Sequence, residues 1–420
     1  MTDLETVTIE KLVHGGQGLA TMADGRKVFV WNALPGEQVT VRIIKQKRSY
    51  VEAIAEEIVV ASEDRIAPQE ENYLSTSPWQ MMTYQAENKY KFAIIQDLFT
   101  HEKVELPQFG PVVAPDTEWN YRNKMEYSFW GDDDGLHLAL HQRGSHGKHI
   151  VTGSKLALPA VDAGARAVAE QLSQLKTRAG DLKTIIVRAN QNGEAVGALF
   201  TKLEKFTKLE LPPELKGLRV YHSNPKSPAS VPTKLLYQLG DCTLHDSLLG
   251  QDFMYDADSF FQVSPPIFEK ALTQIKAHCA GESITDMYAG VGTIGLSVAS
   301  QEVSLIELDS ATVAMARRNA DASELDVTVV ETSSEKALDY VTGKIPVIFD
   351  PPRAGLHDKV VDKVLISMPP KVIYLSCNPA TQARDLAKLQ EKYTIDFFEI
   401  YNFFPRTPHI ETLAVLTPKV

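Results

Sequence analysis

The sequence predicts an α/β protein in which a small β-barrel and a mixed α+β region precede an open, mainly parallel sheet. From about residue 246 onward, short apolar runs alternate with segments of helical periodicity, as in βαβ units. Residues 6–60 instead hold short β-rich runs separated by glycine turns. We therefore expect a barrel in residues 1–60, a central domain in 61–245 and an α/β domain in 246–420.

Composition narrows the class of protein. The chain has 420 residues and is 44% hydrophobic, which is enough for several hydrophobic cores. Its net charge of -11 disfavours the binding of nucleic acid by overall electrostatic attraction alone. No run approaches the roughly 20 apolar residues of a membrane span, and the first residues lack the features of a signal peptide. A cytoplasmic location is the expectation. Basic clusters at 45–48, 121–124 and 141–149 are candidates for local phosphate contacts.

The chain has three cysteines, Cys242, Cys279 and Cys377. They are too few for a disulfide framework, and none has the CxxC spacing of a zinc or iron–sulfur ligand. We therefore predict no metal site and at least one free thiol.

The N-terminal strands surround the turn Gly15-Gly-Gln-Gly18 and include the stretch VFVWNALPGEQVTVRI at 28–43, which is followed by a basic tail. This segment resembles the TRAM module, an OB-like barrel that binds RNA. A small β domain without a ligand is the alternative. In the central region we expect a helix over 79–100, strands at 125–130, 184–188 and 195–200, and a linker at 223–232.

Seven strands are expected in the C-terminal part, preceded by a helix that opens at 264–266, where a serine cap and first-turn prolines fit the rules for helix N-termini. The expected strands are 283–288, 303–307, 327–330, 346–349, 372–375, 395–398 and 412–416.

The first of these strands runs into a glycine-rich turn. Gly290, Gly292 and Gly295 follow the G-x-G-x-x-G pattern, and Glu307 ends the next strand. NAD would place its pyrophosphate on the following helix N-terminus, with Glu307 on the ribose hydroxyls. S-adenosyl-L-methionine carries the same adenosine without phosphates, and Asp286 ahead of the turn would favour its sulfonium or ammonium. A packing turn without a ligand is the third interpretation.

Two further strand ends carry reactive side chains, in Asp350-Pro-Pro-Arg353 and in Ser376-Cys377-Asn-Pro379. Ligands of an open parallel sheet bind beyond the carboxyl ends of its strands, so we expect these side chains to face one crevice. The first motif is similar to an element of amino-methylating enzymes, but arginine replaces the aromatic that stacks on the base. Arginine suits contact with a phosphate or a base edge. Taken singly, each motif also fits a structural role, as a proline turn or a buried cysteine.

A cysteine at this position suits chemistry at carbon 5 of uracil. A thiolate that adds to carbon 6 makes the ring an enolate, whose carbon 5 can attack an electrophilic methyl group. A base must then remove the carbon 5 proton so that the cysteine leaves. Glu411, in Pro408-His-Ile-Glu411, opens the last expected strand and is a candidate for this base.

Together these motifs resemble the RNA (uracil-5-)-methyltransferases with an N-terminal TRAM module. The likeness spans nearly the whole chain: the barrel, 121–124, 259–262, the glycine loop, 350–353, 376–379 and 409–411. It implies a Rossmann-like class I methyltransferase domain, S-adenosyl-L-methionine as methyl donor, and ribosomal or transfer RNA as partner, with no DNA or membrane involved. It also implies that Cys377 is the nucleophile and Glu411 the base, and that Gln262, Tyr288, Glu307 and Asp350 bind the cofactor.

The chain departs from this resemblance at two places. Many members hold a [4Fe-4S] cluster on four cysteines, but Ser75-Thr-Ser77-Pro-Trp-Gln80 stands where a cysteine run would fall, and no cysteine precedes Cys242. We therefore predict no iron–sulfur cluster. Thr293 stands where many relatives have asparagine in the glycine loop, so it is not included among the cofactor residues.

Two alternative functions follow from parts of the pattern. The glycine loop alone fits a nicotinamide-dependent oxidoreductase, and the barrel alone fits a non-catalytic RNA-binding protein. Binding of NADH without a response to S-adenosyl-L-methionine would favour the first. Full activity after replacement of Cys377, or no activity in the wild type, would favour the second.

Overall fold

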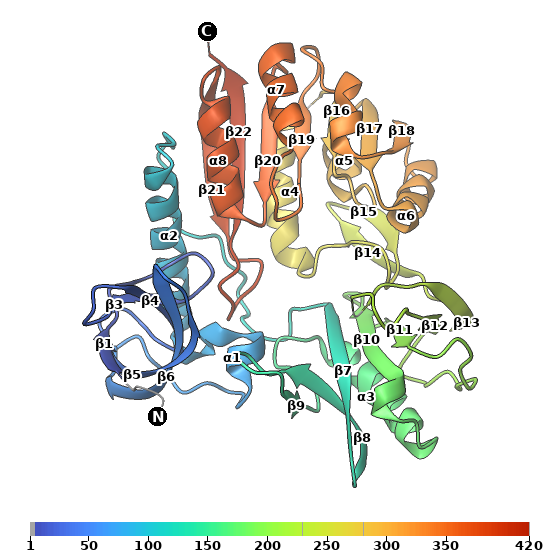
Figure 1. Ribbon diagram of the computed structural model, residues 1–420. Coiled ribbons are helices and arrows are strands. Elements are labelled where there is room, and N and C mark those ends of the chain that lie inside the picture. Colours follow the sequence, from blue (N-terminus) through green and yellow to red (C-terminus); the bar gives the residue numbers. More distant parts are fainter. Residues whose placement is uncertain (1–4, 229, 280, 420) are drawn as a thin grey trace.

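The computed structural model describes residues 5–228, 230–279 and 281–419. Its strands form a six-stranded barrel, a seven-stranded central sheet, a two-stranded hairpin and a seven-stranded C-terminal sheet. Figure 1 shows the barrel and the central sheet below the C-terminal sheet. The predicted α/β fold class is therefore confirmed.

The barrel strands follow the order β1-β5-β6-β4-β3-β2, and their alternate side chains point inward. In β5, for example, Val39 and Val41 are fully buried, whereas the neighbouring Gln38 is exposed. The strands are β1 (Glu5–Thr8), β2 (Lys11–Leu12), β3 (Gly18–Thr21), β4 (Lys27–Trp31), β5 (Gln38–Gln46) and β6 (Tyr50–Val60).

Two helices connect the barrel to the central sheet, the single turn α1 (Tyr73–Thr76) and the long α2 (Tyr84–His101). The helix expected from residue 79 begins later, because the Thr83 side chain accepts a hydrogen bond from the Ala86 N–H and caps α2. The preceding Pro78–Met81 forms a 3-10 turn.

The central sheet has the order β13-β12-β11-β10-β7-β8-β9, and helix α3 (Pro159–Gln174) packs on one of its faces. The expected linker at 223–232 is wrong, because this segment is the loop between two paired strands, β12 and β13. Its backbone is held by Lys183, whose Nζ donates to the carbonyls of Asn224, Ser227 and Pro228. The strands are β7 (Lys124–Asp132), β8 (Gly135–His141), β9 (Lys148–Ile150), β10 (Leu182–Ala189), β11 (Ala195–Thr201), β12 (Gly217–His222) and β13 (Lys234–Gly240).

The hairpin of β14 (Leu244–Leu248) and β15 (Gln251–Tyr255) leads into α4 (Pro265–Cys279), which begins where predicted. The C-terminal sheet has the order β18-β17-β16-β19-β20-β22-β21. The first five of these strands are parallel, and β22 is inserted antiparallel to both β20 and β21. The strands are β16 (Ile284–Met287), β17 (Glu302–Glu307), β18 (Asp326–Glu331), β19 (Val347–Phe349), β20 (Val372–Ser376), β21 (Tyr393–Tyr401) and β22 (Glu411–Pro418).

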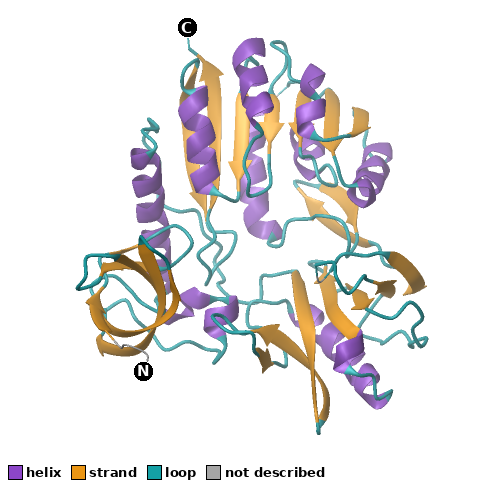
Figure 2. Ribbon diagram, viewed as in Figure 1, coloured by secondary structure: helices purple, strands orange, loops and turns teal. Residues whose placement is uncertain are grey.

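Helices cover both faces of the C-terminal sheet (Figure 2). One face packs against α4, α5 (Thr293–Val298) and α6 (Ser310–Asp321). The other packs against α7 (Asp358–Ser367), α8 (Pro379–Leu389) and α2 of the preceding region. The result is a three-layer α/β/α arrangement.

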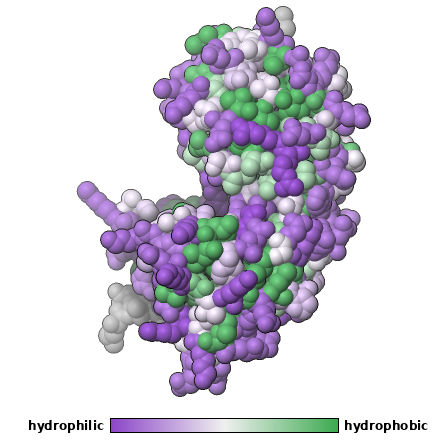
Figure 3. All heavy atoms as spheres, turned by 90° about the vertical axis from the view of Figure 1, so that its right-hand side faces the viewer, coloured by the Kyte–Doolittle hydropathy of each residue, from purple (hydrophilic) through white to green (hydrophobic). Residues whose placement is uncertain are grey.

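The face that carries β13 and β18 mixes polar and hydrophobic side chains and is hollowed on one side between the central and C-terminal parts (Figure 3). Among the helices of the described ranges, none is both long and apolar enough to cross a membrane.

Candidate active site

The carboxyl ends of the parallel strands bring the predicted residues to one edge of the sheet. Tyr288 follows β16, Glu307 ends β17, Asp350 follows β19 and Cys377 follows β20. This is the crevice expected for an open parallel sheet. The register of the antiparallel pair adds Glu411, because Ser376 on β20 pairs with Thr412 on β22.

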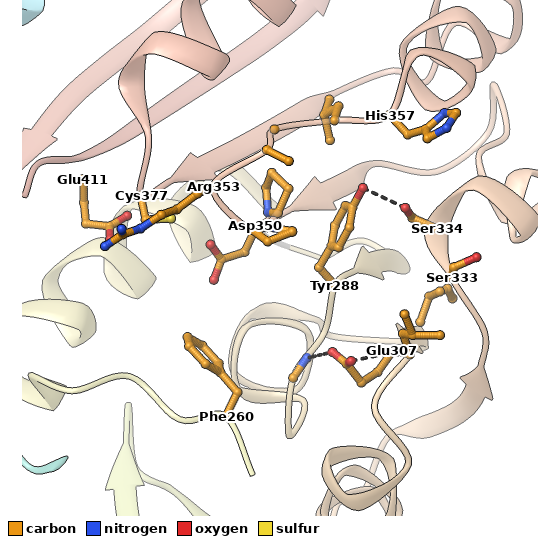
Figure 4. A pocket seen from close by; sticks show the side chains of 18 of the residues that line it. Phe260, Tyr288, Glu307, Ser333, Ser334, Asp350, Arg353, His357, Cys377 and Glu411 are labelled. Atoms are coloured by element: carbon orange, nitrogen blue, oxygen red, sulfur yellow. Dashed lines mark hydrogen bonds between the residues drawn. The ribbon is translucent and has the colours of Figure 1, made fainter. Parts of the chain in front are cut away.

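A cavity of about 910 Å³ opens at this edge, and all six predicted site residues line it. Figure 4 shows two groups of side chains in it. We call Tyr288, Glu307 and Ser333–Ser334 the cofactor half, and Asp350, Arg353, Cys377 and Glu411 the reaction half.

The cofactor half is built on the glycine loop. Gly292 has φ 90°, which allows the chain to turn tightly into α5. Beside this loop Glu307 accepts hydrogen bonds from the backbone N–H groups of Gly290 (3.0 Å), Leu308 (2.7 Å) and Asp309 (2.9 Å). These bonds fix the carboxylate at the strand end, where it faces the cavity.

Tyr288 has φ 69°, in the left-handed region, and its hydroxyl accepts a hydrogen bond from Ser334 Oγ (2.7 Å; Figure 4). A non-glycine residue in this conformation is strained and is typical of a functional site. Ser333 and Ser334 follow β18, and nothing in the sequence pattern singled them out.

Asp286 does not lie where the sequence suggested, in contact with the cofactor. It is fully buried beneath the glycine loop, and its Oδ2 accepts a hydrogen bond from the Gly295 N–H (2.7 Å). Burial raises its pKa to about 8. Asp286 and Thr293, which begins α5, are not among the residues that line the cavity.

Gln262 contacts Asp350 of the reaction half. Gln262 Nε2 donates to Asp350 Oδ2 (3.3 Å), and Asn123 Nδ2 donates to the Gln262 carbonyl (3.0 Å). Asn123 belongs to the predicted basic segment 121–124, so this segment anchors the site from the central region. Burial raises the pKa of Asp350 to about 7, against the effect of the Gln262 hydrogen bond.

In the reaction half, Cys377 and Glu411 lie side by side with Arg353 next to them (Figure 4). Burial raises the pKa of Cys377 to about 12, and the nearby Glu411 and Asp350 add to the rise, while Arg353 opposes it. Burial and Asp350 also raise the pKa of Glu411 well above its usual value. A thiol and a carboxyl group that favour their protonated forms are suited to proton transfer once a substrate changes their surroundings.

The loop with Arg353 is tied to the loop with Cys377. Asn378 Nδ2 donates to the Arg353 carbonyl (2.7 Å), and Thr381 Oγ1 donates to the same oxygen (3.3 Å). The predicted neighbourhood of the two motifs is therefore present. Phe260 projects toward the reaction half from the opposite wall, with 57% of its surface exposed (Figure 4). An exposed aromatic ring beside reactive groups suits stacking on a planar base.

Comparison with known proteins identifies the family of the chain. The profile of the tRNA (uracil-5-)-methyltransferase family matches residues 247–419, and that of the TRAM domain matches residues 4–55. An uncharacterized RNA methyltransferase of Halalkalibacterium halodurans is 31% identical, over 99% of this chain and 97% of the relative. A second one, of Enterococcus faecalis, is 29% identical over 100% of this chain and 98% of the relative.

Among solved structures, the tRNA (uracil-54, C5)-methyltransferase of Pyrococcus abyssi in complex with S-adenosyl-L-homocysteine has a TM-score of 0.76. It is 22% identical, and the match covers 98% of this chain and 100% of that chain. This likeness shows a common fold.

The chain belongs to the uracil-5 family of RNA methyltransferases, which are S-adenosyl-L-methionine-dependent and here carry an N-terminal TRAM domain. The predicted family is confirmed, and the two alternatives, a nicotinamide-dependent oxidoreductase and a non-catalytic RNA-binding protein, are set aside.

Proposed function

We propose that this protein methylates carbon 5 of one uridine in ribosomal or transfer RNA, with Cys377 as nucleophile and Glu411 as base. The observation that carries the proposal is the placement of these two side chains together, beside Arg353, at the edge of the cavity where the family's methyl donor would bind.

We assign the cofactor half to the methyl donor, which supplies an electrophilic methyl group when bound. The Glu307 carboxylate is fixed at the end of β17, where an oxygen can accept a hydrogen bond from a ribose hydroxyl. Tyr288 and Gln262 border the path from this half to the reaction half. Asp350 and its Gln262 partner then lie close to the transferred group.

The reaction half supplies the covalent steps. The Cys377 thiol gives up its proton to solvent, and the thiolate adds to carbon 6 of uracil. Carbon 5 then takes up the methyl group as the sulfur–methyl bond of the donor breaks, and the departing sulfur keeps the electrons of that bond. Glu411, in its ionised form, removes the carbon 5 proton, the carbon 5–carbon 6 double bond re-forms, and Cys377 leaves with the electrons of the carbon–sulfur bond. A carboxylate with a raised pKa is a stronger base than one in water, so the environment of Glu411 supports this role. Phe260 offers a face on which the uracil can stack.

The proposal is tested with RNA that contains 5-fluorouridine. Fluorine at carbon 5 cannot be removed as a proton, so the wild type should become trapped as a methylated covalent adduct that survives denaturing gels, and only when S-adenosyl-L-methionine is present. A second, ordinary substrate is total RNA from a strain that lacks the protein. Mapping the 5-methyluridine that is missing from this RNA identifies the uridine that the protein methylates.

Two variants separate the proposed roles. Cys377→Ala should form no adduct with either RNA, whereas Glu411→Gln should accumulate the adduct even on ordinary RNA, because elimination fails. Adduct formation by Cys377→Ala at the wild-type level would remove Cys377 as the nucleophile.

A further inference from the structure

The connection between β21 and β22, residues 402–410, leads directly into Glu411 and is itself mostly buried. Asn402, Arg406 and Thr407 are at most 2% exposed, and Phe404 and His409 line the cavity together with Glu411. A buried connection must find partners for its polar groups inside the protein. Several of these partners come from α2, 311 to 319 residues earlier in the chain.

Two fully buried side chains, one turn apart on α2, hold this connection. The Glu87 carboxylate accepts hydrogen bonds from Asn402 Nδ2 (2.9 Å) and from the Arg406 N–H (2.9 and 3.1 Å). Lys91 Nζ donates to Asn402 Oδ1 (2.6 Å) and to the Phe404 carbonyl (3.2 Å), and it pairs with Glu87 at 2.9 Å. The two side chains therefore bind both the start and the middle of the connection.

Arg406 needs this support because its backbone is strained. Its φ of 64° lies in the left-handed region, which costs a residue with a side chain on the order of 1–3 kcal/mol. The conformation is fixed from three sides: Glu87 accepts from its N–H, Trp79 N–H donates to its carbonyl (3.2 Å), and its guanidinium donates to the Met82 carbonyl (2.5 Å).

The barrel closes the other side of the same connection. Trp79 Nε1 donates to the Gly16 carbonyl (3.1 Å), which lies in the turn between β2 and β3. A side chain at Gly16 would place its Cβ 2.4 Å from Pro408 Cβ, so the backbone of the barrel turn lies directly against residues 402–410.

We propose that Glu87 and Lys91 are positioning residues for Glu411: they hold residues 402–410 so that the Glu411 carboxyl reaches the proton on carbon 5. This inference rests on the proposed function. A general base must lie within hydrogen-bond reach of the proton it removes, and an error of about 1 Å can cost about 100-fold in rate. The cofactor half stands on other strands, so loss of the α2 contacts should slow elimination without weakening cofactor binding.

The test compares Glu87→Gln and Lys91→Met with wild type, in the full chain and with ordinary substrate RNA. Asp97→Asn is the matched control, since it makes the same carboxylate-to-amide change on α2, where the exposed Asp97 forms only a surface ion pair with Lys11. We expect both variants to lose about tenfold or more in kcat, with cofactor affinity in calorimetry within twofold of wild type. The denaturation-resistant adduct should rise at steady state, as in Glu411→Gln. Asp97→Asn should behave as wild type.

A purely structural role for the pair would lower the amount of folded enzyme without raising the adduct fraction per folded molecule. Wild-type kcat, or reduced kcat without added adduct, would therefore overturn the inference. Glu87→Gln can fold poorly because Lys91 loses its partner. The double variant Glu87→Gln/Lys91→Met removes both charges and should fold while still accumulating adduct. A folded double variant with normal elimination would also overturn the inference. If Glu411→Gln itself accumulates no adduct, the proposed function fails instead, so the two failures are distinct.

Discussion

The two halves of the cavity differ in how the protein treats their charged groups. In the cofactor half, three backbone N–H groups satisfy the Glu307 carboxylate and hold it in place. In the reaction half, burial raises the pKa values of Cys377, Glu411 and Asp350, and neighbouring acidic groups add to the rise for Cys377 and Glu411. The first half therefore holds a carboxylate through fixed hydrogen bonds, whereas the surroundings of the second half favour the protonated forms of its thiol and carboxyl groups.

The largest effect that sharpens this comparison is the pH dependence of Cys377 reactivity. Since burial raises its pKa to about 12, the thiolate fraction in the RNA-free enzyme should grow tenfold with each pH unit below that value. We expect alkylation of Cys377 by iodoacetamide, followed by mass spectrometry, to speed up by about 1000-fold between pH 6 and pH 9. Cys377→Ser controls for Cys242 and Cys279. A rate that levels off near pH 7 would contradict the raised pKa.

A second, smaller effect concerns the cofactor half. Glu307→Ala removes a charged hydrogen-bond acceptor, which costs about 1.5–3 kcal/mol, so the affinity for S-adenosyl-L-methionine should fall by roughly 10- to 100-fold in calorimetry. Glu331→Ala, at the exposed end of the neighbouring β18, should bind as wild type. The alkylation profile of Cys377 should stay unchanged in both variants. Unaltered cofactor affinity in Glu307→Ala would show that this carboxylate does not contact the cofactor.

The smallest effect concerns stability. Because the folded-state pKa of Asp350 is raised to about 7, the unfolded chain gives up this proton first, and stability falls as pH rises from about 4 to about 7. Above about pH 7 the loss of stability caused by the buried Asp350 carboxylate stays constant. A tenfold difference in proton affinity between the folded and unfolded chain corresponds to about 1.4 kcal/mol, and partial exposure of the side chain reduces the total. We expect Asp350→Asn to be about 1–2 kcal/mol more stable than wild type in urea at pH 8 and equal to it at pH 4.

An equal gain for Asp350→Asn at both pH values would assign the effect to packing rather than to the buried charge. The same urea titrations on Asp362→Asn, an exposed position in α7, provide the control for surface charge.

The sequence alone predicted those parts of the site that depend on the position of a residue along a strand. Apolar runs placed the C-terminal strands correctly, and the rule that ligands bind at the carboxyl ends of parallel strands brought Asp350 and Cys377 to one cavity. Tyr288, which lines the same cavity, was predicted only from the family resemblance. Glu411 followed from its place at the start of the last strand. The roles of these residues in binding and catalysis stay predictions.

What the sequence could not show depends on contacts between distant segments. Glu87 and Lys91 are charged side chains, a type that is rarely fully buried, yet both are fully buried against residues 402–410. The hydrogen bond from Ser334 to Tyr288 likewise joins two separate strand ends. Asp286 supports the glycine loop through its hydrogen bond with the Gly295 N–H and does not reach the crevice, because a side chain near the end of a buried strand can point away from that crevice.

The long separation between α2 and the connection that it holds also sets an order of assembly during synthesis. Glu87 is made 319 residues before Arg406, so the helix and the barrel can form while the groups that Glu87 and Lys91 bind have not yet been translated. The two buried charged side chains of α2 therefore find these partners only after the connection between β21 and β22 has been made, near the end of synthesis.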